Sequence, residues 1–321
     1  MRSKTILLTG CAGFIGFSIT KNLLEDKFKV LGIDNLNPYY NIKLKKGRLK
    51  KLKKNNFKFF KTDLTKKKEL HKFKNKKIDL IIHLAAQPGV RYSFDNPQSY
   101  IQNNIVGFSN ILDFANENKL DLIYASSSSV YGDANKYPVN ESDKLNPKNL
   151  YAITKRNNEE MAELYSKAYN MRIIGLRFFT VFGEWGRPDM FILKYFECCR
   201  LKKKFPLYND GNFLRDFTYI KDLVLMVKPL ILKINKFKKN HSVLNICSSK
   251  PLNVKSILVK LTKLTKIKMY KQSKPSYPEV FKTYGDNKKI KKISNIGKFE
   301  RVDEALKNTY NWYLKNKNLF N

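Results

Sequence analysis

The first 34 residues of the chain combine a strand pattern, a glycine-rich turn and a helix pattern. Apolar residues dominate Thr5 to Thr9, glycines follow at positions 10, 13 and 16, and apolar positions then recur at helical spacing through Leu24. A second apolar run, Lys29 to Ile33, ends at Asp34. Short apolar runs bounded by turns are typical of strands buried on both faces. This order predicts two parallel strands joined by a helix.

The same alternation continues along the chain. Helical patterns separate further strand patterns at 57–61, 78–83 and 172–177 and another that begins at Leu122; the two longest helical patterns cover 100–117 and 151–169. Parallel strands need crossover connections, and these are almost always right-handed. We therefore predict an α/β fold built on a Rossmann-type doubly wound parallel sheet.

Lysine dominates the polar positions. The 321 residues carry a formal net charge of +36, and ten of the 63 basic residues are arginines, which leaves 53 lysines. The run from Lys43 to Lys61 is the segment that best supports nucleic-acid binding. Basic residues are nevertheless spread along the whole chain, without a helix-turn-helix, zinc-finger or RNA-recognition signature. We therefore expect no nucleic-acid partner.

Membrane insertion and metal binding are not indicated either. No run reaches the ~18 consecutive apolar residues of a membrane-spanning helix, and the N-terminus enters a strand pattern instead of a signal peptide. We expect a cytoplasmic protein without membrane insertion. The four cysteines, Cys11, Cys198, Cys199 and Cys247, have neither zinc-site nor disulfide spacing. We therefore expect no metal site.

The glycine turn has the features of a dinucleotide-binding site. Gly10, Gly13 and Gly16 have G-x-x-G-x-x-G spacing between a strand and a helix. Glycines allow the backbone to approach a pyrophosphate, and a helix N-terminus offers free N–H groups and a positive dipole end. Asp34, about eighteen residues after the last glycine, is placed to accept hydrogen bonds from ribose hydroxyls and to repel a 2′-phosphate. The pattern predicts NAD, not NADP, as the cofactor.

A second chemical pattern lies between Leu122 and Lys155. A strand pattern runs into four serines, 126–129, and Tyr151 and Lys155 then open a helical segment. Residues four apart lie on one face of a helix, so the lysine ammonium can lie near the tyrosine hydroxyl and favour its phenolate. The Ser127 hydroxyl can bond the same substrate oxygen. Such an arrangement can remove a proton from a sugar hydroxyl while a nicotinamide accepts the hydride.

The scarce arginines and one histidine complete the candidate set. Arg91, Arg177, Arg187 and Arg215 lie in segments that have the character of active-site loops, where a planar guanidinium suits phosphate or carboxylate. His83 follows a fully apolar strand pattern. We expect it to be a structural histidine with satisfied hydrogen bonds, not a catalytic one.

Several segments between Thr9 and about Asp222 carry a family resemblance. They read TGCAGFIG, DNLNPYYN, HLAAQPGVRYSFDNPQSY, YASSSSVYG, YAITK, GLRFFTVFGEWGRPDM and RDFTYIKD. With them the sequence resembles the extended short-chain dehydrogenase/reductases, the NAD-dependent epimerase/dehydratase family, and within it the UDP-glucuronate 4-epimerases. The C-terminal third is only loosely similar.

The resemblance implies roles for individual residues. The expected NAD-binding residues are Gly10, Gly13, Phe14, Ile15, Gly16, Asp34, Asn35, Asp63, Leu64, Leu84, Ala85, Ala86, Asn103, Tyr151, Lys155 and Phe178. Tyr151 is expected to be the catalytic base, Lys155 its activator and Ser127 the hydroxyl partner. The residues expected to bind the nucleotide sugar are Arg91, Ser127, Ser128, Ser129, Tyr151, Thr180, Arg187 and Arg215, with Arg91 recognising the acidic sugar.

The resemblance also implies an organisation of the chain. We expect residues 1–180 to form the NAD-binding Rossmann domain, with a returning segment near 216–247. Residues 181–321 are expected to form a smaller C-terminal α/β domain that binds the nucleotide sugar and includes two amphipathic helices after Lys250. Family members commonly dimerise through the helices that begin near Tyr100 and Tyr151, so a homodimer with a four-helix bundle is implied.

The residues after Ser127 distinguish reactions within the family. Dehydratases have an Asp-Glu pair there, and uronate decarboxylases have Glu at the position of Ser129. This chain has Ser128 and Ser129, and so no local carboxylate for a second proton transfer. The resemblance therefore implies inversion of carbon 4 of UDP-glucuronate, through a 4-keto intermediate, to give UDP-galacturonate for surface-polysaccharide synthesis. We expect the hydroxyls of Ser127, Ser128, Ser129 and Thr180 to hold the sugar carboxylate.

Three alternatives stay open at the level of sequence. The first is a 4-epimerase of UDP-glucose or of a UDP-N-acetylhexosamine or -uronate, or another nucleotide-sugar-modifying enzyme of the superfamily. The second is a binding protein that kept the fold without the chemistry, against which the intact Tyr151 and Lys155 argue. The third is a basic protein that binds nucleic acid or a membrane surface through charge alone.

Overall fold

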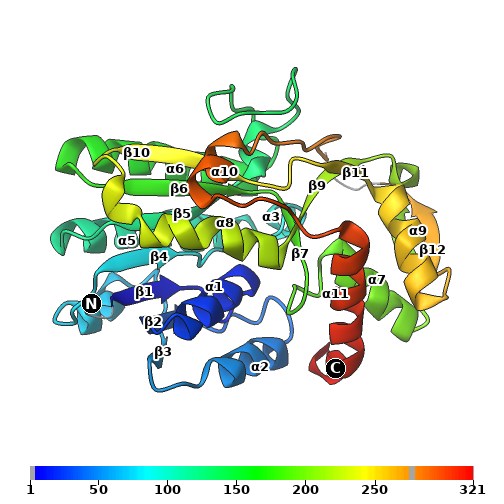
Figure 1. The fold of residues 1–321 in the computed structure, drawn as a ribbon, viewed down its shortest axis with the longest axis horizontal. Coiled ribbons are helices and arrows are strands. Elements are labelled where there is room, and N and C mark those ends of the chain that lie inside the picture. The colour runs from blue at the N-terminus through cyan, green and yellow to red at the C-terminus, as the bar shows by residue number, and fades with distance from the viewer. Residues whose placement is uncertain (1–3, 275–278, 321) are drawn as a thin grey trace.

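A seven-stranded sheet forms the centre of the protein in a computed structural model, which describes residues 4–274 and 279–320 (Figure 1). The strand order is β10-β6-β5-β4-β1-β2-β3. The strands are β1 (Thr5–Thr9), β2 (Lys29–Asp34), β3 (Phe57–Lys61), β4 (Leu80–His83), β5 (Leu122–Ser127), β6 (Ile173–Phe178) and β10 (His241–Ile246). Every neighbouring pair is parallel. The predicted Rossmann-type doubly wound sheet is therefore confirmed.

Helices cover both faces of this sheet (Figure 1). One face carries α1 (Phe14–Glu25), α2 (Ile42–Leu52) and α8 (Ile220–Leu232), and the other carries α5 (Gly107–Glu117) and α6 (Leu150–Tyr169). Strand β1 illustrates why both faces are covered. Ile6 and Leu8 belong to the apolar cluster that includes α1 and α8, whereas Leu7 belongs to the cluster that includes α5 and α6. Successive side chains of a strand point to opposite faces, so each continuous apolar run supplies two cores.

The strand order reverses between β1 and β4, which are neighbours in the sheet. From β1 the sheet continues outward through β2 and β3, and from β4 it continues through β5, β6 and β10. Doubly wound sheets bind ligands outside the carboxyl ends of the strands at such a switch point. Gly10, Leu84 and Ser128 directly follow three of these strand ends.

The remaining strands and most of the remaining helices lie beside the sheet (Figure 1). A three-stranded sheet has the order β11 (Pro251–Asn253), β9 (Leu214–Tyr219), β7 (Thr180–Phe182), and a two-stranded sheet pairs β12 (Tyr270–Ser273) with β8 (Phe205–Tyr208). The helices there are α7 (Phe191–Arg200), α9 (Val254–Thr265) and α11 (Val302–Asn316), whereas α10 (Lys288–Ser294) packs against α8 and β10 of the central sheet. Three helices thus follow Lys250 in the described residues where the sequence predicted two; the additional one, α10, has only seven residues.

The predicted helix over 100–117 begins earlier and is irregular. The short helices α3 (Tyr92–Asp95) and α4 (Pro97–Tyr100) lead into a π-helical turn, Ile101–Val106, which continues into α5. Within that turn the Asn104 side chain accepts from the Gln87 N–H (2.7 Å) and donates to the Gln87 carbonyl (3.1 Å). Insertions of this kind are frequent at functional sites. The turn therefore ties this helix to the loop that follows β4.

None of the helices within the described ranges is both long and apolar enough to cross a membrane.

Candidate active site

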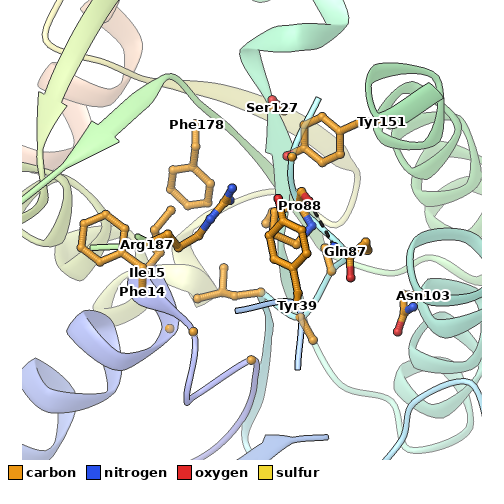
Figure 2. Close-up of a pocket in the computed structure, with 18 of the residues that line it drawn as sticks. Phe14, Ile15, Tyr39, Gln87, Pro88, Asn103, Ser127, Tyr151, Phe178 and Arg187 are labelled. Atoms are coloured by element: carbon orange, nitrogen blue, oxygen red, sulfur yellow. Dashed lines mark hydrogen bonds between the residues drawn. The ribbon is translucent and has the colours of Figure 1, made fainter. Parts of the chain in front are cut away.

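A cavity of about 410 Å³ opens above the carboxyl ends of the central strands. Figure 2 shows Ser127 and Tyr151 on one side of it, Phe178 and Arg187 on the other, and Phe14 and Ile15 near its floor. Twenty of the predicted site residues line this cavity: Gly10, Gly13, Phe14, Ile15, Gly16, Asp34, Asn35, Leu64, Leu84, Ala85, Ala86, Asn103, Ser127, Ser128, Ser129, Tyr151, Lys155, Phe178, Thr180 and Arg187. Asp63, Arg91 and Arg215 do not line it.

The glycine turn leaves no room for side chains. Gly10 has a φ of +74°, and a Cβ on it would lie 2.7 Å from the backbone nitrogen of Ala85. A Cβ on Gly16 would lie 2.1 Å from the Gly10 carbonyl oxygen. Helix α1 begins just beyond, with Gly13 as an N-cap that offers no side-chain hydrogen bond. The turn thus presents backbone N–H groups in a concave site, as a pyrophosphate requires.

Asp34 lies at the end of β2 and lines the cavity beside the glycine turn. Its buried carboxylate accepts hydrogen bonds from the backbone N–H groups of Leu36 (2.8 Å) and Ala12 (3.2 Å). The ammonium of Lys45 lies 3.6 Å away and is itself buried. The sequence analysis overlooked Lys45 because it belongs to a lysine-rich run that is otherwise typical of an exposed face.

Thr62 lines the cavity, whereas its neighbour Asp63, an expected NAD-binding residue, does not. The Asp63 carboxylate accepts hydrogen bonds from the Thr65 N–H (3.0 Å) and hydroxyl (2.9 Å), and so caps its own turn. Thr62 lines the cavity instead, and its buried hydroxyl has no hydrogen-bond partner in the described part of the chain.

Tyr151, Lys155 and Ser127 line the same cavity. Tyr151 and Lys155 lie one turn apart in α6, and Ser127 ends β5. The Lys155 ammonium donates to the Ala125 carbonyl (2.9 Å) at the edge of the same cavity. The start of α6 is fixed by Asn149, whose side chain accepts from the Ala152 N–H.

The electrostatics of this group differ from the sequence expectation. Burial raises the pKa of Tyr151, while its hydrogen bond with Ser127 and the charge of Arg187 lower it. Burial also lowers the pKa of Lys155 to about 8, against the opposing charge of Glu159. Arg187 is therefore a cation that favours the Tyr151 phenolate in this structure, while the Lys155 ammonium is bonded to a backbone carbonyl.

The serine cluster is divided by orientation. The Ser127 hydroxyl accepts from the Ser129 N–H (3.2 Å) and lies 3.1 Å from the Ser129 hydroxyl, and Ser127, Ser128 and Ser129 all line the cavity. Ser126 points the other way and donates to Glu159 (2.5 Å). Ser126 and Ser127 are successive residues of β5, so their side chains point to opposite faces of the sheet, although both residues border the cavity.

Arg177 forms a buried ion pair inside the fold, so the prediction that it lies in an active-site loop is wrong. It lies in the interior of β6, is buried, and pairs with Glu159 through Nε (2.9 Å) and Nη2 (2.7 Å). The ion pair lies behind Ser126, away from the cavity lining. The sequence could not distinguish it from the other three arginines because a strand-end arginine and a loop arginine have the same local pattern.

Arg91 and Arg215 line a second cleft of about 190 Å³, which shares Thr180 with the main cavity. Glu279 joins the two arginines: it forms an ion pair with Arg91 and lies 3.7 Å from Arg215. The Arg91 guanidinium also stacks 4.0 Å from the centre of the Tyr208 ring. The sequence analysis missed Glu279 and Tyr208, because no local motif marks residues that meet only through the fold.

His83 confirms the structural prediction. Its ring is buried, and its Nδ1 lies 2.9 Å from the Thr9 hydroxyl. Burial, followed by the charge of Lys155, lowers its pKa to about 3, so the ring is neutral at physiological pH. Separately, across residues 4–274 and 279–320 no group of three or more His, Cys, Asp or Glu side chains could hold a metal ion.

Known proteins are similar to this chain in sequence and in fold. The sequence profile of the NAD dependent epimerase/dehydratase family matches residues 6–247. An uncharacterised protein of Methanocaldococcus jannaschii is 43% identical over 324 residues, which cover 99% of this chain and 98% of its relative. A UDP-glucuronate 4-epimerase of Thermodesulfobacterium geofontis is 36% identical over 320 residues, covering 97% and 96%.

A solved structure agrees over the same length. The crystal structure of UDP-glucuronic acid 4-epimerase from Bacillus cereus in complex with UDP-glucuronic acid and NAD is 30% identical, covers 97% of this chain and 99% of its own, and has a TM-score of 0.89. The family profile covers most of the chain, and the relatives cover nearly all of it. The chain therefore belongs to the NAD-dependent epimerase/dehydratase family.

Proposed function

We propose that this protein is an NAD-dependent UDP-sugar 4-epimerase that interconverts UDP-glucuronate and UDP-galacturonate. The observation that carries the proposal is the convergence of Ser127, Tyr151 and Lys155 with a glycine turn in one cavity. The Thermodesulfobacterium and Bacillus relatives, which match almost the whole chain, are UDP-glucuronate 4-epimerases. Their similarity supports the same reaction here.

The cavity fits NAD. The glycine turn would hold the pyrophosphate, and Asp34 would accept hydrogen bonds from the ribose hydroxyls and disfavour a 2′-phosphate. Phe178 would lie beside the nicotinamide. When bound, NAD supplies a reversible two-electron acceptor for carbon 4 of the sugar.

Tyr151 performs the proton transfer in this proposal. Its oxygen takes the proton of the sugar 4-hydroxyl, and Ser127 donates a hydrogen bond to the oxygen that becomes the keto group. Arg187 favours the phenolate, and Lys155 keeps a positive charge beside it at neutral pH because its pKa is about 8. After the 4-keto sugar has turned its other face to the site, Tyr151 returns the proton to the same oxygen.

The serine cluster supports a uronate as the substrate. A 4-keto uronate is a β-keto acid, and it loses carbon dioxide when the bond to its carboxylate aligns with the keto group. Ser128, Ser129 and Thr180 line the cavity with hydroxyls that can hold the carboxylate out of that alignment. Neither residue after Ser127 is an acid that could complete a decarboxylation or dehydration.

This role of the serines can be tested by product analysis. Replacing Ser128 and Ser129 together by alanine is expected to raise the fraction of decarboxylated pentose among the products, measured by NMR. Ser256→Ala, on the exposed side of α9, is the matched control. An unchanged product ratio in the double variant would remove the serines from this role.

The second cleft is proposed to bind the nucleotide end of the substrate. Arg91 and Arg215 lie in that cleft with Tyr208, and not beside Tyr151. Two guanidinium groups and an aromatic ring suit a diphosphate and a uracil. We therefore assign Arg91 to the nucleotide in place of the sugar carboxylate that the sequence analysis gave it.

A homodimer formed through α6 and the irregular helix before α5 is part of the proposal. Ile153 and Leu164 of α6 are 50% and 65% exposed, and Ile101 is 36% exposed. Exposed apolar side chains on two neighbouring helices suit a four-helix bundle between two copies. The division into domains at about residue 180, a cytoplasmic location and a role in polysaccharide synthesis belong to the same proposal.

The decisive experiment compares substrates on the purified protein. UDP-glucuronate, UDP-glucose and their N-acetyl counterparts are incubated separately, without added reductant, and epimer formation is followed by NMR. The proposal expects UDP-glucuronate to be converted fastest. Faster conversion of a neutral or N-acetylated sugar would assign the enzyme to that substrate, and no conversion of any of them would contradict an epimerase.

A further inference from the structure

Arg48 is a buried arginine that the proposed reaction does not use. It lies in α2, whose other basic residues are largely exposed, yet its own exposure is 0%. Its hydrogen-bond acceptors are all neutral: the carbonyls of Ala12, Trp185 and Gly186 and the hydroxyl of Tyr40. None of the ion pairs found in residues 4–274 and 279–320 includes Arg48. A buried cation of this kind needs a reason other than a partner carboxylate.

The guanidinium joins the glycine turn to a loop whose Trp185 lies 137 residues after Arg48 in the sequence. On the cofactor side, Nη1 donates to the Ala12 carbonyl (2.8 Å), inside the glycine turn, and to the Tyr40 hydroxyl (2.6 Å). On the other side, Nε (3.1 Å) and Nη2 (2.6 Å) donate to the Trp185 carbonyl, and Nη2 also reaches the Gly186 carbonyl (3.1 Å). All five N–H donors of an arginine are thereby used.

The loop that Arg48 holds has an uncommon backbone. Trp185 has a φ of +62°, which non-glycine residues rarely adopt and which persists only where the surroundings enforce it. Its indole packs against Phe17 and Trp312, with ring centres 5.1 Å apart in each case. A Cβ on Gly47 would lie 3.3 Å from the same indole, so α2 approaches it closely. Arg48 therefore bonds the backbone of the residue whose conformation most needs support.

Two residues after Trp185 the same loop delivers Arg187 to the cavity. Arg187 is held by Asp189 through Nε (3.0 Å) and Nη2 (2.5 Å), and Asp189 also accepts from the Tyr39 hydroxyl (3.1 Å). The loop is thus bonded to the segment 39–48 on both sides of Arg187. Arg187 is also the cation that lowers the pKa of Tyr151, so its placement bears on the proton transfer.

We propose that Arg48 is a positioning residue that ties the loop carrying Arg187 to the glycine turn, so that the cofactor and substrate sides of the cavity keep one relative placement. The effect on turnover rests on the proposed function. The placement of the loop does not, and it can be measured without substrate.

Arg48→Lys separates geometry from charge, because lysine keeps the positive charge but carries its three N–H donors on one nitrogen, in place of the five donors of a planar guanidinium. In a Trp312→Phe background Trp185 is the only tryptophan, since the chain has two. There, Arg48→Lys is expected to raise acrylamide quenching of Trp185 at least twofold. In the otherwise native chain it is expected to lower kcat for UDP-glucuronate at least tenfold, with NAD retained through gel filtration within twofold of the native amount. Lys50→Arg, on the exposed side of α2, is the control.

Unchanged quenching with unchanged kcat would overturn the proposal. So would a loss of activity that excess NAD restores while quenching stays native, because Arg48 would then serve cofactor retention alone. If Arg48→Lys fails to fold, amide hydrogen exchange of the native chain still decides. Adding NAD is expected to slow exchange in 183–190 together with 10–16, and slowing confined to 10–16 would overturn the coupling. Failure of the epimerase proposal itself would appear as absence of turnover in the native chain and would leave these readouts unaffected.

Discussion

The main cavity and the arginine cleft are built in different ways, although they share Thr180. The cavity depends on backbone: a glycine turn without room for a Cβ, strand ends and the first turn of a helix. The cleft depends on side chains from distant segments, since Arg91 and Glu279 are 188 residues apart. A site that requires close approach of the backbone to its ligand can therefore be recognised from a short stretch of sequence. A site formed by charged side chains from distant segments becomes recognisable only in the folded chain.

Removing the Tyr151 hydroxyl should have the largest effect on the cavity. Tyr151→Phe is expected to lower turnover by about 10²- to 10⁴-fold, the usual contribution of a general acid–base group. NMR of product formation and the NAD content of the purified variant test this together. Tyr169→Phe, at the exposed end of the same helix, should behave as the native chain. Native turnover in Tyr151→Phe would refute the proposed role of the cavity.

A methyl group in the glycine turn should disrupt cofactor binding next most strongly. In Gly16→Ala the Cβ would meet a backbone oxygen at 2.1 Å, so the turn must shift. We expect NAD to be lost during purification and the free energy of unfolding to fall by about 1–3 kcal/mol. Absorbance of bound NAD and denaturant titration measure the two effects. Gly297→Ala, where no atom lies within 4 Å of the added Cβ, is the control.

Loss of an arginine from the cleft should affect binding more than chemistry. Arg91→Met is expected to raise KM for the UDP-sugar about tenfold with little change in kcat, because the lost interaction acts on the substrate and the transition state alike. Steady-state kinetics test this, with Arg156→Met in the exposed Glu160 pair as the control. A fall in kcat at constant KM would place Arg91 in the chemical step and erase the contrast between the two regions.

The buried His83 should produce the smallest effect, visible as pH dependence of stability. Its pKa is 6.5 in the unfolded chain and about 3 in the folded one, so between these values only the unfolded chain binds the proton. The neutral ring therefore makes its full contribution to the free energy of unfolding above pH 6.5. As the pH falls below that value, the free energy of unfolding decreases by about 1 kcal/mol per pH unit. Urea titrations from pH 7 to pH 5 should show a shallower loss in His83→Gln than in the control His71→Gln. Equal slopes would contradict this account.

The sequence predicted the parts that depend on local order. The strand, turn and helix around Gly10 to Gly16 and the spacing of Tyr151 and Lys155 are properties of short segments, and the structure brings them together. Arg177 was misassigned because its partner, Glu159, is recognisable only after β6 and α6 have packed. Glu279 was missed for the same reason.

Charge patterns were the least informative signal. Lys45 and Arg48 belong to a run that resembles a solvated surface, yet both are buried next to the cofactor side of the cavity. Burial of a cation depends on which carbonyls and carboxylates the folded chain supplies, and composition does not contain that information.

Trp312 of α11 packs against Trp185, so this helix contacts the loop before Arg187 in addition to covering the apolar core. Through this contact α11 supports the loop that presents Arg187 to the cavity. The carboxyl-terminal portion of the enzyme should therefore tolerate change at its surface lysines far better than loss of the aromatic ring at position 312.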